Sequence, residues 1–245
     1  HGLLVASTHP PVGRVVALNQ MHEQLRLAPA QGNGSTLTLE FASLQFQQPG
    51  SGVVTAPQGH TLLRRFRRGL WVEWHYTYGP IQVTRQLFLH WKEQSATLRY
   101  RIVHTEHHAT PGAVLHLAPM MTLRDFHSLQ RRTGGDGLQV DATSRPGLVA
   151  VHRLSDTPGQ RLTLTMLCPR GTWNVAAEPW WYHVFYAAEA ERGQDCHEDY
   201  FVPGQFVVPL DLRQEEEVVF TVALGDMPVD DQAWRSTDRV RHLQP

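Results

Sequence analysis

The sequence of 245 residues is short of cysteine, of excess charge and of long apolar runs. Its two cysteines, Cys168 and Cys196, are too few for a disulfide framework and lack the paired spacing of a zinc site. With 22 basic and 23 acidic residues, the formal net charge is −1, so no overall field attracts nucleic acid or an anionic membrane surface. These shortages predict free thiols and an electrically neutral partner.

No apolar run approaches the roughly 20 residues that span a bilayer. The amino end, HGLLVASTHPPVGR, has no basic head before an apolar core, which an export signal would need. We therefore expect a soluble protein of the reducing cytoplasm, with neither membrane nor nucleic acid among its partners.

Fifteen histidines are many for this length, but they are scattered. Only His104, His107 and His108 cluster, and they lie where an apolar alternation meets a Pro-Gly turn, which favours a solvated loop. A metal site would need further ligands converging from elsewhere in the chain. We expect no metal site and no cofactor.

Apolar and polar residues alternate along most of the chain, in short segments separated by Gly, Pro or Asp. Two irregularities within residues 60–91, at Arg67 to Gly69 and at Tyr78 to Pro80, predict hairpin turns. The alternating segments are 14–27, 36–46, 60–91, 96–105, 114–123, 137–144, 147–154, 160–167, 205–212 and 215–225.

More than a dozen strands without βαβ alternation predict an all-β protein, built as a large antiparallel β-sandwich of two sheets. No repeat of blade length is present, which argues against a propeller. No helix of ten residues is expected before Pro228, but Asp230 is a good N-cap and charges at helical spacing follow it. We therefore divide the chain into a β domain at 1–229 and a short C-terminal helical linker at 230–245.

Ionisable residues are densest between Glu189 and Gly204, in EAERGQDCHEDYFVPG, where seven of the first eleven residues can carry charge. Aromatic residues flank this segment on both sides, Trp180 to Tyr182 among them. Carboxylates, a guanidinium and flat rings together suit a sugar, which offers an apolar face and a rim of hydroxyls. The alternative is a surface turn whose charges pair with one another, each exposed pair contributing about 0–1 kcal/mol.

Three groups of short motifs are distinctive. The first is HGLLVA at residues 1–6 followed by PVGR at 11–14, and the second is LRDFH at 123–127. The third is Trp181-Tyr182 followed by EAERGQD at 189–195 and Glu198-Asp199. These segments resemble the amino-terminal domain of the bacterial and archaeal glycogen debranching enzyme, or amylo-α-1,6-glucosidase, family. Together these motifs are specific, although each alone is weak.

The resemblance implies a supersandwich of the galactose-mutarotase type, with the hydrolytic carboxylates on a following (α/α)₆ barrel. The 245 residues leave no room for that barrel, so we expect no catalytic residue here. The implied partners are an α-glucan, such as glycogen or a maltooligosaccharide, and a catalytic barrel in cis or in trans. The sequence departs from the family at Phe126, which stands where the family has a tyrosine, and lacks the tyrosine and glycine-rich run expected before His1.

The charged residues after an apolar strand should be paired rather than free. Arg124 has three candidate partners across the sheet: Asp195, Glu198 and Asp199. We hypothesise a substrate-binding set comprising Arg124, Asp125, His127, Trp181, Tyr182, Glu191, Arg192, Asp195, Glu198 and Asp199. The alternative is an ion-pair network that fixes the shape of the domain or its contact with the barrel.

Two enzymatic alternatives stay open. A hydrolase acting alone would need two opposed carboxylates roughly 5–10 Å apart, for which Glu191 and Glu198 are candidates. A free-standing aldose mutarotase or epimerase would use His127 as acid with Glu198 as base. A carbohydrate-binding module would bind glucan without turnover, and a plain scaffold would not bind sugar.

Neighbouring aromatic residues on one strand should divide between core and surface. Because successive strand residues face opposite sides, Trp181 shares a face with Trp180 and Tyr182 only if the strand twists or bulges. One of the three rings is therefore expected in the core. Trp71 and Trp74, in a strong strand, are assigned to packing.

Overall fold

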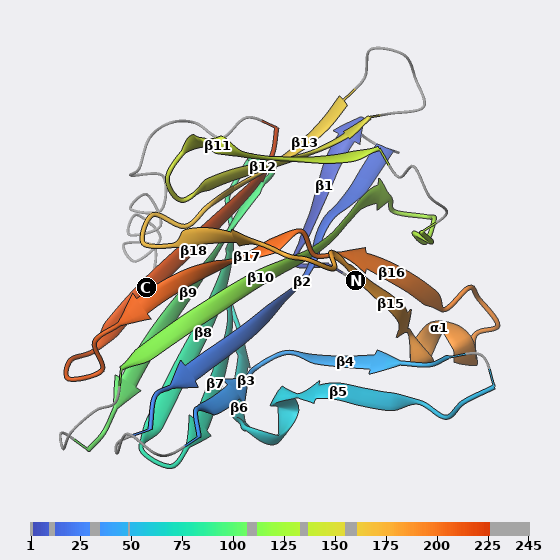
Figure 1. Cartoon of the computed structure of the whole chain (residues 1–245). Coiled ribbons are helices and arrows are strands. Elements are labelled where there is room, and N and C mark those ends of the chain that lie inside the picture. Colours follow the sequence, from blue (N-terminus) through green and yellow to red (C-terminus); the bar gives the residue numbers. More distant parts are fainter. Residues whose placement is uncertain are drawn as a thin grey trace.

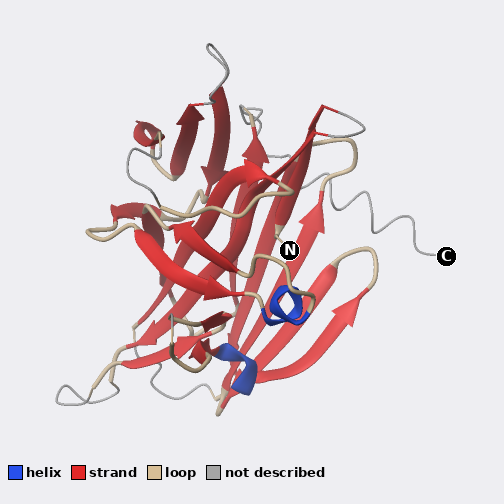
Figure 2. Ribbon diagram, turned by 90° about the vertical axis from the view of Figure 1, so that its right-hand side faces the viewer, coloured by secondary structure: helices blue, strands red, loops and turns tan. Residues whose placement is uncertain are grey.

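The computed structural model describes residues 2–9, 13–29, 35–48, 50–106, 112–132, 137–154 and 161–225. The helix predicted at 230–245 lies outside these residues, as do His107 and His108. Almost all regular structure in the described ranges is antiparallel β-sheet, arranged in two sheets (Figures 1 and 2). The predicted all-β sandwich is thereby confirmed.

The larger sheet has ten strands. Its main path runs β1 (Leu4–His9), β2 (Gly13–Leu27), β10 (Ala113–Asp125), β16 (His197–Phe201), β15 (Trp180–Phe185), β4 (Ser43–Phe46) and β5 (Val54–Gln58). Off this path, β17 (Gly204–Leu210) joins β10 to β14 (Thr172–Val175), and β3 (Leu37–Glu40) pairs with β2.

The smaller sheet has eight strands. Their order is β11 (Leu138–Arg145), β12 (Leu148–Leu154), β13 (Arg161–Leu167), β18 (Glu216–Leu224), β9 (Ser95–His104), β8 (Ile81–Leu89), β7 (Val72–Tyr78) and β6 (Leu63–Arg68). Both predicted hairpin turns are present, between β6 and β7 and between β7 and β8. Gly79 in the second turn has φ +51°, a conformation that glycine adopts at little cost.

Two short helical segments interrupt the strands in the described part of the chain: η1 (Gly59–Thr61) and α1 (Ala187–Glu191). α1 lies beside the ends of β15 and β16 and near β4 (Figure 1). None of the helices found in those ranges is long and apolar enough to cross a bilayer.

The two longest strands, β2 and β10, form the central ladder of the larger sheet. Their pairing runs from Leu27 opposite Ala113 to Val15 opposite Asp125. The register shifts twice near the end of β10, between Met120 and Arg124. Such irregularities bend a strand and redirect its side chains, and they occur here just before the LRDFH segment.

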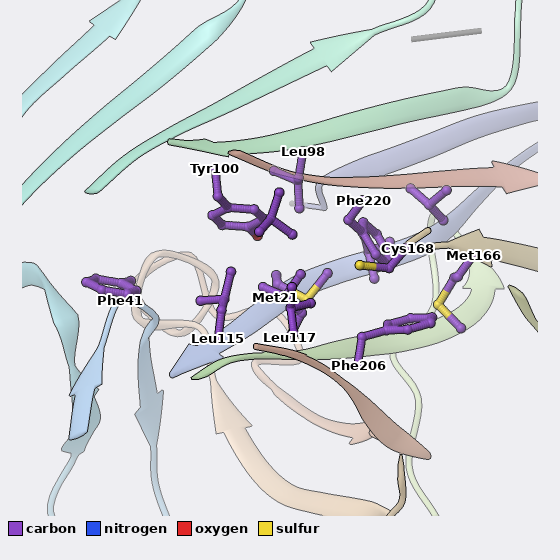
Figure 3. Packing of buried hydrophobic residues seen from close by; sticks show 14 of the residues in the cluster. Met21, Phe41, Leu98, Tyr100, Leu115, Leu117, Met166, Cys168, Phe206 and Phe220 are labelled. Atoms are coloured by element: carbon purple, nitrogen blue, oxygen red, sulfur yellow. The ribbon is translucent and has the colours of Figure 1, made fainter. Parts of the chain in front are cut away.

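The main core lies between the two sheets (Figure 3). Met21, Leu115 and Leu117 from the larger sheet pack in one cluster with Leu98 and Tyr100 from the smaller one, and all are fully buried. Trp74 packs against this cluster, as predicted. The centre of the Trp71 ring lies 5.6 Å from that of the Phe88 ring, and Trp71 is not part of the cluster.

A second, smaller cluster covers the other face of the larger sheet. Neighbouring strand residues face opposite sides of a sheet. Leu117 therefore packs in the main core, whereas Ala118 and Met120 pack on the other face with Leu44, Val184 and Tyr200. Both cysteines are free thiols, with Cys168 buried in the main core.

A buried ion pair connects the two sheets inside the main core. Arg85 on β8 donates from Nη1 to Oε1 of Glu23 on β2 at 2.8 Å, and Glu23 is 0% exposed. The Tyr100 hydroxyl donates to the same oxygen at 3.0 Å, and the Arg85 guanidinium lies 3.9 Å from the centre of the Trp74 ring. Charges this deep are stable only while each retains its partner.

We predict that Glu23→Ala lowers the free energy of unfolding by about 3–5 kcal/mol, because it leaves the Arg85 charge buried without a partner. Urea denaturation would measure this. The triple variant Glu23→Leu/Arg85→Met/Tyr100→Phe removes every polar member and should recover most of the loss. A triple variant no more stable than Glu23→Ala would contradict this account of the pair.

Candidate functional site

The Glu198 carboxylate on β16 is 0% exposed and is the centre of a buried network. Arg124, 8% exposed, donates to Oε1 from Nε and to Oε2 from Nη2, the second at 3.1 Å. The Gln130 amide, the Tyr186 hydroxyl and the Asn19 side-chain amide also donate to this carboxylate. We call these five residues the Glu198 network. Of the three candidate partners for Arg124, the structure selects Glu198.

The LRDFH segment is shaped to present Arg124 inward. Leu123 has φ +49°, which turns the chain at the end of β10. Arg124 Nη1 then donates to the carbonyls of Asp125 and Phe126 at 3.0 and 3.2 Å, and Asp125 Oδ1 accepts the His127 amide at 2.8 Å. One guanidinium thus holds the turn and the carboxylate together.

Asp199 also has a structural role in the described contacts. It is 8% exposed, and its two oxygens accept the backbone amides of Arg132 and His183 at 2.9 and 3.0 Å. Its own amide donates to the Gln130 carbonyl at 2.8 Å. Asp199 therefore connects the loop after β10 to β15.

A bulge in β15 separates its three neighbouring aromatic rings. The pairing with β16 shifts between Trp181 and Val184, and His183 has φ +61°. Trp180 packs against the main core, while Trp181 packs against the second cluster, 5.0 Å from the His22 ring. Tyr182 is exposed, and its hydroxyl accepts a hydrogen bond from Arg132. Two rings, rather than one, thus contribute to packing.

A cavity of about 600 Å³ lies over the Glu198 network, and we call it the charged cavity. Its volume falls in the range typical of small-molecule sites. Its lining combines three aromatic or imidazole rings with four ionisable or amide groups from the predicted segments. The lining residues are Val16, Arg124, Phe126, His127, Ser128, Leu129, Tyr186, Glu189, Gln194 and Asp195.

Three of the ten predicted site residues line the charged cavity: Arg124, His127 and Asp195. Glu198 and Asp199 lie buried within the hydrogen-bonded framework, and Asp125 caps the turn. The remaining four predicted residues do not line the charged cavity: Trp181, Tyr182, Glu191 and Arg192.

Glu189 lines the charged cavity although the substrate-binding set chose Glu191 instead. Both lie on α1, and residues two apart on a helix point to nearly opposite sides. Glu189 is therefore half-buried toward the cavity while Glu191 is exposed. A predicted helical turn at 187–191 would have distinguished them. The lining residues Tyr186 and Gln194 were not in the predicted set either.

Two phenols keep their protons in this environment. Burial raises the pKa of Tyr186 far above its usual range, and Tyr200 and the negative Glu198 raise it further. Burial likewise raises the pKa of Tyr200 to about 12. Tyr186 therefore stays a hydrogen-bond donor to Glu198, and the two phenol oxygens lie 2.7 Å apart.

The surroundings of Glu198 and His127 differ in ways that matter for the proton transfer that the enzymatic alternatives require. Glu198 is enclosed and already accepts five hydrogen bonds, so it is poorly placed to take a proton from a substrate. His127, by contrast, is exposed at the cavity. No group of three or more His, Cys, Asp or Glu side chains with metal-binding geometry occurs in the ranges described above.

The fold defines an all-β protein built as a sandwich of two large antiparallel sheets. The chain belongs to the glycogen debranching enzyme N-terminal family, whose sequence profile matches residues 1–218. A search of curated proteins gives no match by sequence.

Three solved structures show similarity at low sequence identity. A heparan sulfate lyase HepC mutant from Pedobacter heparinus has 11% identity over 69% of this chain and 22% of its own, with a TM-score of 0.40. A bacterial glucoamylase complexed with acarbose has 8% identity over 95% of this chain and 31% of its own, with a TM-score of 0.40. A putative kojibiose phosphorylase from human microbiome has 9% identity over 98% of this chain and 33% of its own, with a TM-score of 0.38. The chain spans only about a fifth to a third of the length of these proteins.

We predict that Glu198→Ala lowers the free energy of unfolding by about 3–5 kcal/mol, because the buried Arg124 charge loses its partner. Glu191→Ala, in the same segment but exposed, should change it by no more than about 0.5 kcal/mol. Urea denaturation of both variants would test the contrast. Equal, small effects would show that the Glu198 network does not stabilise the domain.

Proposed function

We propose that this chain is a non-catalytic domain that binds or positions an α-glucan. In this proposal it also shapes the cleft of a separate (α/α)₆ catalytic barrel, either in the same polypeptide or on another chain. Residues 230–245 would lead toward that barrel, the complete protein would be an amylo-α-1,6-glucosidase, and it would act in the cytoplasm. Membership of the glycogen debranching enzyme N-terminal family supports the assignment to glucan debranching.

One observation carries the proposal: two of the three family-like segments line the charged cavity, and the other is hydrogen-bonded to one of them. LRDFH contributes Arg124, Phe126 and His127, and EAERGQD contributes Glu189, Gln194 and Asp195. The PVGR segment meets them where the Arg14 carbonyl accepts the Phe126 amide at 3.0 Å. Segments far apart in the sequence thus lie around one cavity.

The chemistry of the charged cavity suits a neutral sugar. Carboxylate, amide and imidazole groups bond hydroxyls at defined angles, while the Phe126 and Tyr186 rings offer apolar surface to the C–H face of a pyranose. Positive and negative side chains both line the cavity, so a ligand with a large charge of either sign gains little there.

The first test is calorimetric titration of the purified chain with maltooligosaccharides, with assays for released glucose and for anomer interconversion on the same samples. We expect heat of binding and neither activity. Faster anomer interconversion would support the mutarotase alternative, with His127 as the acid. No heat and no turnover would support a scaffold that does not bind sugar.

We predict that Asp195→Ala weakens maltooligosaccharide binding about tenfold, the effect of losing a charged hydrogen-bonding group. Its pair with Arg131 is exposed, at 62% and 43% of the two side chains, so stability should change by less than about 1 kcal/mol. Affinity and thermal midpoint measured on the same variant separate the two effects. Unchanged affinity would remove Asp195 from the site, and Glu191→Ala is the matched control.

A further inference from the structure

A second cavity, of about 480 Å³, shares Tyr186 with the charged cavity. We call it the neutral cavity, because neither a carboxylate nor a lysine or arginine lines it. Its lining consists of Gln20, Ser43, Leu44, Gln45, Thr55, His60, Val184, Phe185, Tyr186 and Tyr200. No residue of the three family-like segments lines this cavity.

The neutral cavity exists because β4 separates from β15. The two strands pair only where Phe46 meets Val184, so the preceding residues of β4 are not joined to Phe185 and Tyr186. β4 instead pairs with β5, and this hairpin lies below α1 and β15 in Figure 1. The space between hairpin and sheet is lined by side chains from both.

η1 closes one side of the neutral cavity and needs a glycine to do so. The Gly59 amide donates to the Ala42 carbonyl at 2.9 Å, and a Cβ at Gly59 would lie 2.4 Å from the Phe41 backbone. This approach brings His60 against β4, where its amide donates to the Ser43 hydroxyl at 2.8 Å.

The lining offers hydrogen-bonding groups that the protein itself does not use. The side chains of Gln20, Gln45 and Thr55 line this cavity, and none of them has a hydrogen-bond partner within the described ranges. Together with the Phe185 ring they present amides, a hydroxyl and an apolar face. These groups match an uncharged, hydroxyl-rich ligand and give no counter-charge to an anion.

Tyr186 is held firmly between the two cavities. Its hydroxyl donates to Glu198 at 2.5 Å and lies 2.7 Å from the Tyr200 hydroxyl, so the ring has a fixed orientation. A rigid aromatic ring loses little conformational entropy when a sugar stacks on it.

We infer that a single α-glucan chain occupies both cavities and crosses Tyr186 between them. The domain then recognises a run of several glucose units, with one part of the chain in the charged cavity and another in the neutral cavity. This inference rests on the proposed function and adds a second, chemically distinct part to the site.

The test uses calorimetric titration of the chain with maltose and with maltoheptaose. Gln45 and Thr55 are cross-strand partners on β4 and β5, so Gln45→Ala/Thr55→Ala removes two adjacent polar groups from the neutral cavity. We expect the double variant to bind maltoheptaose about tenfold more weakly than the unmodified chain does, and maltose within about twofold.

The matched control is Gln82→Ala/Thr77→Ala, which removes the same cross-strand pair of residue types from β8 and β7 of the other sheet. It should bind both sugars as the unmodified chain does. Thermal midpoints of both double variants show whether each remains folded.

The outcomes separate this inference from the proposed function. If Asp195→Ala weakens binding but Gln45→Ala/Thr55→Ala binds maltoheptaose like the unmodified chain, the glucan uses the charged cavity alone and the inference fails while the proposed function stands. Equal affinity of the unmodified chain for maltose and maltoheptaose would also overturn the inference. Absence of binding to either sugar would overturn both.

Discussion

The arrangement of the site depends on one buried ion pair, Arg124 with Glu198. It joins β10 to β16 at the point where β10 ends, and it holds the turn that carries His127. A buried pair contributes little net stability compared with apolar packing, but losing either partner is costly. The pair therefore acts mainly as a constraint on geometry: only a chain path that brings the LRDFH turn to β16 satisfies both charges. The Glu23–Arg85 pair imposes a similar condition between the two sheets.

Alternation and turn residues were sufficient to predict most of the fold. They indicated most of the strands and both hairpins at β6 to β8, because a half-buried sheet imposes a period of two on its sequence. The alternating segments did not include β1, β5, β14, β15 and β16. The partners within the site were harder to predict. Arg124 had three candidate carboxylates, and the choice of Glu198 depends on register shifts in β10 and β15 that no periodicity records. The neutral cavity was not predicted either, since it results from the parting of β4 and β15.

Charge density was a useful guide to the location of the site but a poor guide to individual roles. Glu198 and Asp199 carry charge in the same segment as Glu191 and Asp195, yet the first two are enclosed by donors and the last two are exposed. The difference comes from secondary structure: β16 begins at His197 and buries its next four residues, whereas α1 and the loop after it face solvent. A buried carboxylate on β16 can hold the site together, whereas an exposed carboxylate on α1 or the loop after it can contact a ligand.

An exposed ion pair and a buried ion pair at the charged cavity differ in how easily ligand hydroxyls could replace them. Arg131 and Asp195 are both substantially exposed, so their pair is worth about 0–1 kcal/mol and hydroxyls can replace it at little cost. Arg124 and Glu198 lie out of water, and breaking their pair would leave two buried charges unsatisfied. A neutral sugar would therefore rearrange the rim of the charged cavity and leave its floor intact. Tyr186, bonded to that floor, would keep its orientation whether or not sugar is bound.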